Sequence, residues 1–133
     1  MLKLLLIFAM AMFFTSTINA QSDRLDTIKE IAACATLDRI VQDLTDRIDR
    51  EKNWIERNRN NNNVSVDRFN KRVDENNGVV DEQNILNDAY KANCERKSMS
   101  RENARAVCMT RTDNMSEFIY SSPFCKDVRE RLN

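Results

Sequence analysis

The apolar positions in the first half of the chain recur with the spacing of a helix. Leu37, Val41, Leu44, Ile48 and Ile55 follow one another at intervals of 4, 3, 4 and 7 residues, which places them on one face. Charged residues occupy most of the positions between them. We therefore expect an amphipathic helix from about residue 22 or 26 to about residue 57.

A second amphipathic segment follows a run rich in asparagine. Residues 58–63 contain five asparagines and one arginine, and because asparagine competes with the helix backbone and tolerates turns, this run predicts a loop. Ser65 is the expected N-cap of the next helix. Its apolar stripe keeps its phase across Gly78, so we expect one helix with a weak point there; Asn77-Gly78 also has the composition of a tight turn that would split it. The stripe consists of Val66, Phe69, Val73, Val80, Asn87, Tyr90 and Cys94.

Two independent patterns predict the same register for an antiparallel hairpin. When the chain folds back at residues 58–63, residues whose numbers sum to about 128 face each other, so the two stripes align and Cys34 meets Cys94. That pairing leaves Cys108 and Cys125 for a second disulfide, while the other two connectivities stay formally open. The spacings contain no pair of cysteines two to four residues apart, which disfavours a zinc site.

The last third of the chain predicts a compact helical cap. Ser100 is the expected N-cap of a short helix that ends near residue 111, and a further turn begins at Asp113 or Ser116. Pro123 breaks that turn, and residues 124–132 form a last short helix that Cys125 ties back. We expect this cap, which is rich in large apolar residues, to pack on the base of the hairpin.

Residues 1–20 have the layout of a secretory signal peptide. A single Lys3 precedes an apolar run over residues 4–14, which is too short to span a bilayer, and a polar region follows. We expect cleavage after Ala20, with cleavage after Thr17 or retention as an anchor as alternatives. The prediction is thus an exported protein, periplasmic in a Gram-negative bacterium and otherwise secreted. We expect the mature part, residues 21–133, to form one all-α domain with a hairpin over about 25–95 and a cap over about 96–133.

Composition narrows the classes of function. The 133 residues include one glycine, one proline, four cysteines and no histidine, and 21 basic side chains balance 21 acidic ones. The lack of histidine excludes histidine-dependent catalysis and histidine metal sites, and zero net charge gives no electrostatic argument for nucleic acid. An even number of cysteines in an exported chain predicts two disulfides. We expect no catalytic residues, no metal and no cofactor, and no stable membrane insertion after cleavage.

Asparagine recurs every seven residues in the second helix, at Asn63, Asn70, Asn77 and Asn84. A valine lies three residues after each of the first three asparagines. The asparagine and valine rows therefore have the spacing of the two core positions of a coiled coil. Three interpretations are open. The asparagines form hydrogen bonds across the hairpin and fix its register, they pair with a second copy in a dimer, or they form a polar recognition stripe.

The same stretch carries a resemblance to a class of proteins. Arg68-Phe69-Asn70, the pairs at 76–77 and 83–84, Tyr90 and Cys94 resemble the aromatic-Asn heptads of small exported bacterial helical-hairpin proteins whose function is unassigned. The resemblance covers about residues 66–94, and an aromatic residue precedes asparagine only at Phe69-Asn70. It implies a bacterial, exported setting and carries over no active-site residue.

The predicted tip of the hairpin is the candidate partner-binding site. The single tryptophan lies one turn before the loop, among arginines, which is the composition of an interface hot spot; alternatively, it packs across the hairpin near Phe69 or Val73. We expect a protein partner of unknown identity, bound and neutralised in the manner of an inhibitor or immunity protein that acts on a toxin or a cell-wall hydrolase. A chaperone-like or envelope-structural protein, with a possible homodimer, is the alternative, and a carrier of small ligands is a weaker one. The candidate residues are Trp54, Arg57, Arg59, Asn61 and Arg68.

Overall fold

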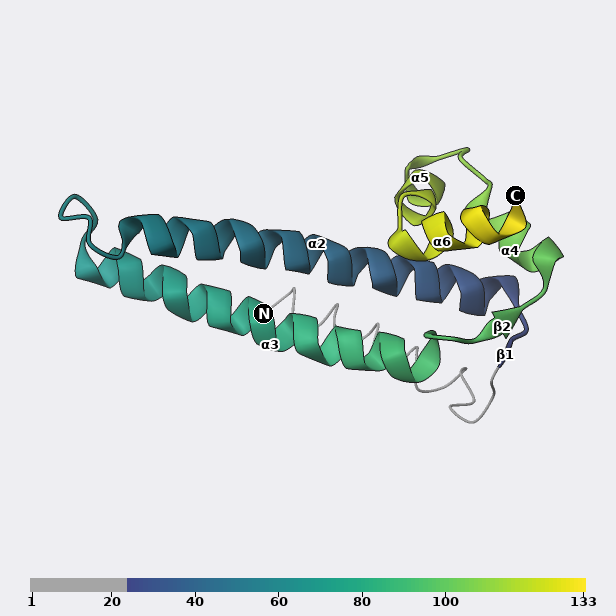
Figure 1. The fold of residues 1–133 in the computed structure, drawn as a ribbon, viewed down its shortest axis with the longest axis horizontal. Coiled ribbons are helices and arrows are strands. Elements are labelled where there is room, and N and C mark those ends of the chain that lie inside the picture. Colours follow the sequence, from purple (N-terminus) through teal and green to yellow (C-terminus); the bar gives the residue numbers. More distant parts are fainter. Residues whose placement is uncertain (1–23) are drawn as a thin grey trace.

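The computed structural model describes residues 24–133, so the predicted signal peptide at 1–20 lies outside the described part. Within that part the chain is mostly helical and contains two disulfides, as the sequence predicts. Two long helices lie side by side, and three short helices form a head at one end (Figure 1). The elements are β1 (Arg24–Leu25), α2 (Ile28–Asn58), α3 (Val66–Asn93), β2 (Ser98–Met99), α4 (Arg101–Cys108), α5 (Asn114–Tyr120) and α6 (Pro123–Leu132).

A capping box starts α2. The Thr27 hydroxyl accepts a hydrogen bond from the Glu30 backbone at 3.1 Å, and the Glu30 carboxylate accepts one from the Thr27 backbone at 2.9 Å. These contacts satisfy N–H groups that have no partner inside the helix. The helix then runs for 31 residues, roughly 46 Å at 1.5 Å per residue.

The second long helix, α3, begins at the N-cap Ser65, whose hydroxyl accepts from the backbone of Arg68 at 3.3 Å. It continues without a break through Gly78, so the expectation of one helix is confirmed. The Cys34–Cys94 disulfide joins the start of α2 to the end of α3, which is the pairing that the register predicts. The tip loop over residues 59–65 connects the helices at the far end (Figure 1).

The heptad asparagines do not form the seam. Asn63, Asn70, Asn77 and Asn84 are all exposed, so of the three interpretations the one in which they hydrogen-bond across to α2 is wrong. A row of valines every seven residues can form a coiled-coil seam with either of two other rows, the residues three positions before each valine or those three positions after it. The row before the valines contains the heptad asparagines. The row after them contains the aromatic residues, and this row faces α2. Its members are Phe69, Asn76, Gln83 and Tyr90, all buried or half-buried.

Polar residues therefore occupy the middle of the α2–α3 interface. The Gln83 amide donates to the Thr45 hydroxyl at 3.2 Å, whereas the Asn76 side chain is only 7% exposed and its Oδ1 has no hydrogen-bond partner among the described residues. Ile48 and Val79 are the buried apolar residues of this stretch. The hairpin consequently buries little apolar surface away from its base.

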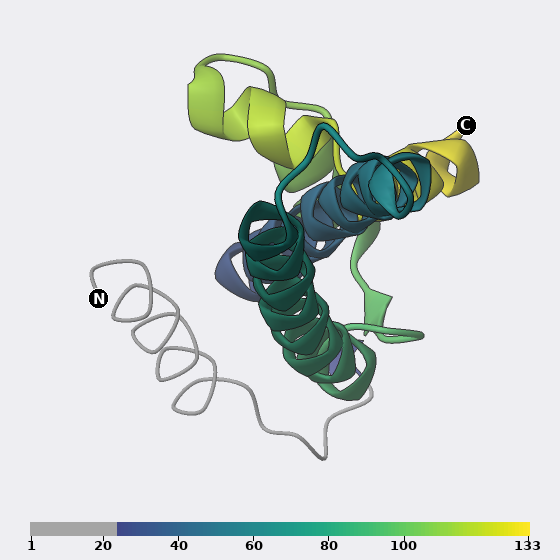
Figure 2. The same ribbon diagram turned by 90° about the vertical axis from the view of Figure 1, so that its left-hand side faces the viewer.

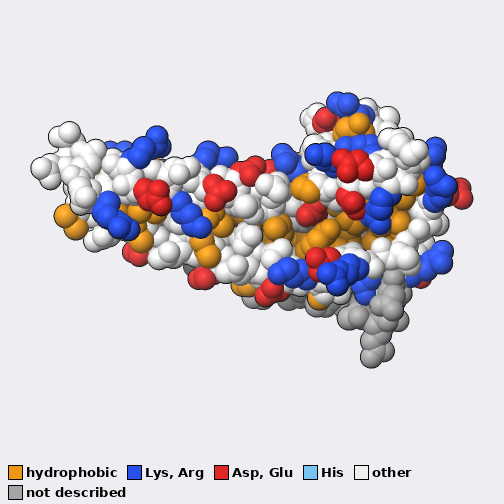
Figure 3. Space-filling model, viewed as in Figure 1, with side chains coloured by type: hydrophobic (Ala, Val, Ile, Leu, Met, Phe, Trp, Pro, Cys, Tyr) orange, Lys and Arg blue, Asp and Glu red, His pale blue; other side chains and the backbone are white. Residues whose placement is uncertain are grey.

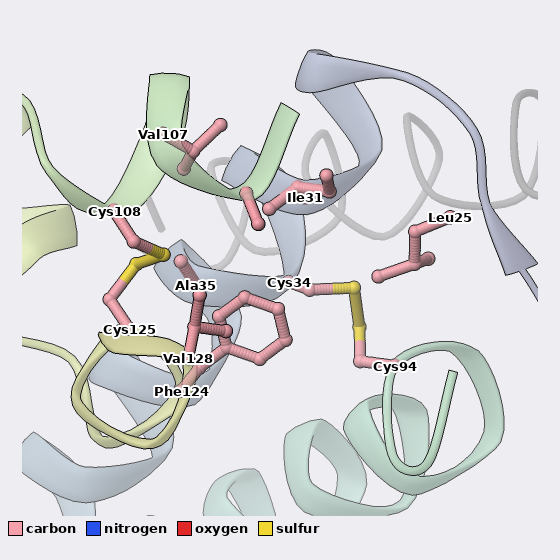
Figure 4. Close-up of a cluster of buried hydrophobic side chains, with 11 residues drawn as sticks. Leu25, Ile31, Cys34, Ala35, Cys94, Val107, Cys108, Phe124, Cys125 and Val128 are labelled. Carbon is pink, nitrogen blue, oxygen red and sulfur yellow. A yellow bond between two sulfur atoms is a disulfide. The ribbon is translucent and has the colours of Figure 1, made fainter. Parts of the chain in front are cut away.

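The head packs on the side of α2 that faces away from α3 (Figure 2). Its helices start at the N-caps Ser100, Asp113 and Ser122, and α6 begins at Pro123, one residue earlier than predicted and in the position where proline is favoured. The Cys108–Cys125 disulfide joins α4 to α6. The two disulfides, the start of α2 and part of the head form the main core (Figure 4).

A short parallel strand pair, which the sequence does not predict, closes the base. Arg24 pairs with Ser98 and Leu25 with Met99, in β1 and β2. Leu25 is 1% exposed and belongs to the core. Strands of two residues have no periodicity that could be recognised in the sequence.

Candidate functional site

A hollow lined by apolar and charged side chains lies at the base, between α6 and the end of α3 with the segment that follows it. Two adjoining hollows of about 500 and 450 Å³ share Lys97, Ser98, Met99 and Arg131 in their walls, and we call them together the base groove. Its apolar lining includes Tyr90, Met99, Phe124, Val128 and Leu132. Hydrophobic side chains gather in this region between the head and the end of α3, with charged side chains on both sides (Figure 3).

Residues 94–99 form one wall of the groove, and their position follows from the local backbone geometry. The backbone N–H of Cys94 donates to the Tyr90 carbonyl at 2.8 Å and closes the last turn of α3. Arg96 then takes a left-handed conformation with φ of 59°, which reverses the chain after a helix end and which glycine adopts at lower cost. The chain leaves this turn into β2, and β1 holds that strand in place.

The other wall is formed by α6, and a side chain of α2 binds the first turn of this helix. The Phe124 backbone N–H donates to the Asp38 carboxylate of α2, and Ser122 caps the same helix by accepting from Cys125 at 3.0 Å. Burial raises the pKa of Asp38, and the hydrogen bond from Phe124 opposes that rise. Burial, followed by the negative charge of Asp38, also raises the pKa of Tyr90 to about 12.

Cations outnumber acids around the base groove. The lining contains four basic side chains and two acidic ones, Glu95 and Asp127. Asp127 forms an ion pair with Arg131, whose Nη2 lies 2.6 Å from Asp127 Oδ2. The Arg101 guanidinium donates to the Leu132 carbonyl at 3.4 Å. The groove thus combines an apolar floor with a mildly positive rim, an arrangement that suits a segment with apolar and acidic side chains.

The five residues predicted to bind a partner divide into two groups in the structure. Trp54 packs across the hairpin on Phe69, with ring centroids 6.2 Å apart, and the Arg72 guanidinium lies 3.9 Å from the Trp54 ring. Glu51 in turn holds Arg72 through two hydrogen bonds of 2.7 and 3.0 Å. The alternative that Trp54 packs near Phe69 is confirmed.

Asn61 also has a role inside the molecule. Its amide donates to Asn58 Oδ1 at 2.9 Å, and its own Oδ1 accepts from the Asn63 backbone at 3.0 Å, which shapes the tip loop. The other three predicted residues, Arg57, Arg59 and Arg68, are exposed. The structure thus brings the predicted residues together at the tip and leaves the three arginines open to solvent.

The base groove is not predicted by the sequence. Its walls come from segments about 30 residues apart, and no short motif marks them. The sequence does show that the head is rich in apolar and basic residues. Whether these side chains face one groove depends on how α6 packs on α2. Among residues 24–133, no group of three or more acidic or cysteine side chains is placed to hold a metal ion.

Comparison with known proteins gives no match: no family model, no curated protein and no solved structure is similar to this chain. In the described part of the chain, no helix is long and apolar enough to cross a membrane.

Proposed function

We propose that the protein is an exported, non-enzymatic binding module of the inhibitor or immunity type, which holds a segment of a protein partner in the base groove. The partner class is a toxin or a cell-wall hydrolase of the same compartment. The observation that carries the proposal is the groove itself, a hollow lined by both apolar and charged side chains on a scaffold braced by two disulfides.

Rigidity is the physical link between the fold and binding. The Cys34–Cys94 bond fixes the end of α3, which forms one wall, and the Cys108–Cys125 bond fixes α6, which forms the other. Because these walls are already ordered, a partner that enters the groove does not bear the entropic cost of ordering them. Small disulfide-braced domains commonly occur in oxidising compartments, which supports export.

Site-specific photo-crosslinking in the producing cell tests the proposal. A photoreactive residue replaces Arg96 at the groove rim in one variant and Arg105 in the control variant, since Arg105 is exposed on the head outside the groove. We expect one partner to crosslink in stoichiometric amount at position 96 and not at position 105. The purified partner should then lose its toxic or hydrolytic activity when the protein is added.

Charge reversal provides the second measurement. Arg96→Glu with Arg131→Glu should weaken binding of the identified partner, whereas Arg105→Glu with Lys126→Glu on the head surface should leave it unchanged. Absence of any crosslink at position 96, or equal weakening by the two pairs, would overturn the assignment of the groove. Binding without loss of the partner's activity would overturn the inhibitor function alone.

Homo-oligomerisation is the second candidate, in line with an envelope-structural function. Two large apolar side chains of α3 are unusually exposed, Val66 at 72% and Ile85 at 68%. A second copy that covered them would remove this apolar surface from water. Light scattering decides this point, because a monomer at all accessible concentrations contradicts self-association.

A further inference from the structure

Charge is strongly segregated along the hairpin although the whole chain is neutral. The tip, which we define as residues 50–72, contains seven Lys and Arg against three Asp and Glu. The rest of the hairpin, residues 28–49 and 73–95, contains four basic residues against eleven acidic ones. A positive end therefore projects from a negative shaft, at the far side of the molecule from the head (Figure 1).

Most cations of the tip are available to an external partner. Six of the seven are exposed, and only Arg72 is half-buried and paired with Glu51. Lys71 has a distant ion pair of 3.9 Å with Glu75, and Arg57 donates to the carbonyl of Asn53 in its own helix. The remaining four form no ion pair with any described residue: Arg50, Lys52, Arg59 and Arg68.

The tip also presents apolar and aromatic side chains behind these cations. Val66, the first residue of α3, is the most exposed of the large apolar residues at 72%. The stacked pair of Trp54 and Phe69 lies about one turn behind the loop and holds the two helices together there. Cations surrounding an aromatic and aliphatic end are typical of surfaces that meet the headgroup region of a membrane.

From this geometry we infer that the tip docks on the surface of an anionic phospholipid bilayer. The exposed cations are distributed over the ends of both helices rather than on one face, and four of the six form no ion pair with a described residue. Such a surface recognises charge density rather than a complementary shape, which favours a bilayer over a folded acidic protein. The acidic shaft is repelled by the same bilayer, so the hairpin stands on its tip and the base groove points away from the membrane.

The expected strength follows from the excess charge. Each Lys or Arg near an anionic surface strengthens binding about fivefold, so four unbalanced cations give an enhancement on the order of 500-fold over a neutral bilayer. The attraction is confined to a Debye length, which falls from about 10 Å to about 3 Å between 0.1 M and 1 M salt. Binding should therefore be lost at high salt.

Vesicle co-sedimentation of the mature, oxidised protein tests the inference. We expect binding to vesicles of equal parts phosphatidylglycerol and phosphatidylcholine, and none to pure phosphatidylcholine. Arg57→Gln, Arg59→Gln and Arg68→Gln together should weaken binding on the order of 100-fold. The matched control, Lys29→Gln, Arg105→Gln and Lys126→Gln, removes the same charge from exposed positions off the tip and should retain binding. A shift of Trp54 fluorescence reports contact directly, because the chain has one tryptophan.

Several outcomes would overturn the inference. Equal losses in the two triple variants would mean that binding follows total charge and not the tip, and unchanged binding of the tip variant would locate the contact elsewhere. Failure to bind phosphatidylglycerol vesicles at low salt would exclude the bilayer. Saturable binding of inorganic phosphate in competition with vesicles would indicate a discrete anion site, and a protein captured by a photoreactive residue at position 59 would indicate an acidic protein partner. Variants of the base groove should leave vesicle binding unchanged, so failure of this test and failure of the proposed function can be told apart.

Discussion

Replacing Asn76 by valine should stabilise the protein. Asn76 lies in the α2–α3 interface at 7% exposure, and its Oδ1 has no hydrogen-bond partner among the described residues. Valine has a similar size and occupies the neighbouring seam positions Val73 and Val80. The adjacent Asn77 is exposed on the same helix and offers a matched control, because Asn77→Val makes the same chemical change outside the interface.

The magnitude follows from the environment of the amide. A buried carbonyl group without a partner costs about 1–3 kcal/mol, and burying the valine methyl groups adds about 1 kcal/mol. Asparagine and valine have similar helix propensities, so that contribution cancels. Strain from the branched Cβ of valine reduces the gain, and we expect the free energy of unfolding to rise by about 2 kcal/mol. For a domain of this size, that corresponds to an increase in Tm of roughly 8 °C.

Urea unfolding followed by far-ultraviolet circular dichroism and by Trp54 fluorescence gives the free energy of unfolding, with both disulfides intact. Asn77→Val should lie within about 0.5 kcal/mol of the parent protein. A loss of stability in Asn76→Val, with the control unchanged, would show that the Asn76 amide has a favourable partner, and the reasoning would be refuted. Light scattering must show the same oligomeric state for all three proteins, because a buried asparagine can also specify the number of packed helices.

Four further predictions use the same unfolding assay. Gly78→Ala should add about 1 kcal/mol, because a Cβ at Gly78 meets nothing within 4 Å and alanine favours the helix; a loss would contradict regular helix there. Arg96→Gly should add about 1 kcal/mol by relieving the left-handed conformation, and an unchanged value would show that Arg96 is not strained. Cys34→Ala with Cys94→Ala should remove about 4 kcal/mol, since the bond closes a loop with a sequence separation of 60; a loss under about 1 kcal/mol would contradict the loop-entropy account. The pKa of Tyr90 is raised to about 12 in the folded protein, above its unfolded value. The contribution of the neutral Tyr90 side chain to the free energy of unfolding is therefore complete below about pH 10 and is lost as the pH rises to 12. Tyr90→Phe should flatten the stability profile between pH 10 and 12, and an unchanged slope would show that another group titrates there.

Much of the framework could be predicted from the sequence because it depends on neighbouring residues. Helix boundaries follow from caps such as Thr27 and Ser65 and from the 3.6-residue periodicity, and the asparagine-rich run marks the loop. The matching lengths of the two stripes then bring Cys34 to Cys94, which leaves the second disulfide to the remaining pair.

Tertiary structure alone decided how the side chains of these helices are used. The valine heptads permit two seams, and only the packing of α3 on α2 places Asn76 inside and Asn77 outside. Trp54 was recognised as a candidate contact, but whether it faces a partner or Phe69 depends on the opposing helix. The base groove arises where the end of α3 meets α6, and it required the relative position of segments that are distant in sequence. Periodicity determines which residues share a face of one helix, whereas the face that becomes buried is set by what packs against it, and that information is not local.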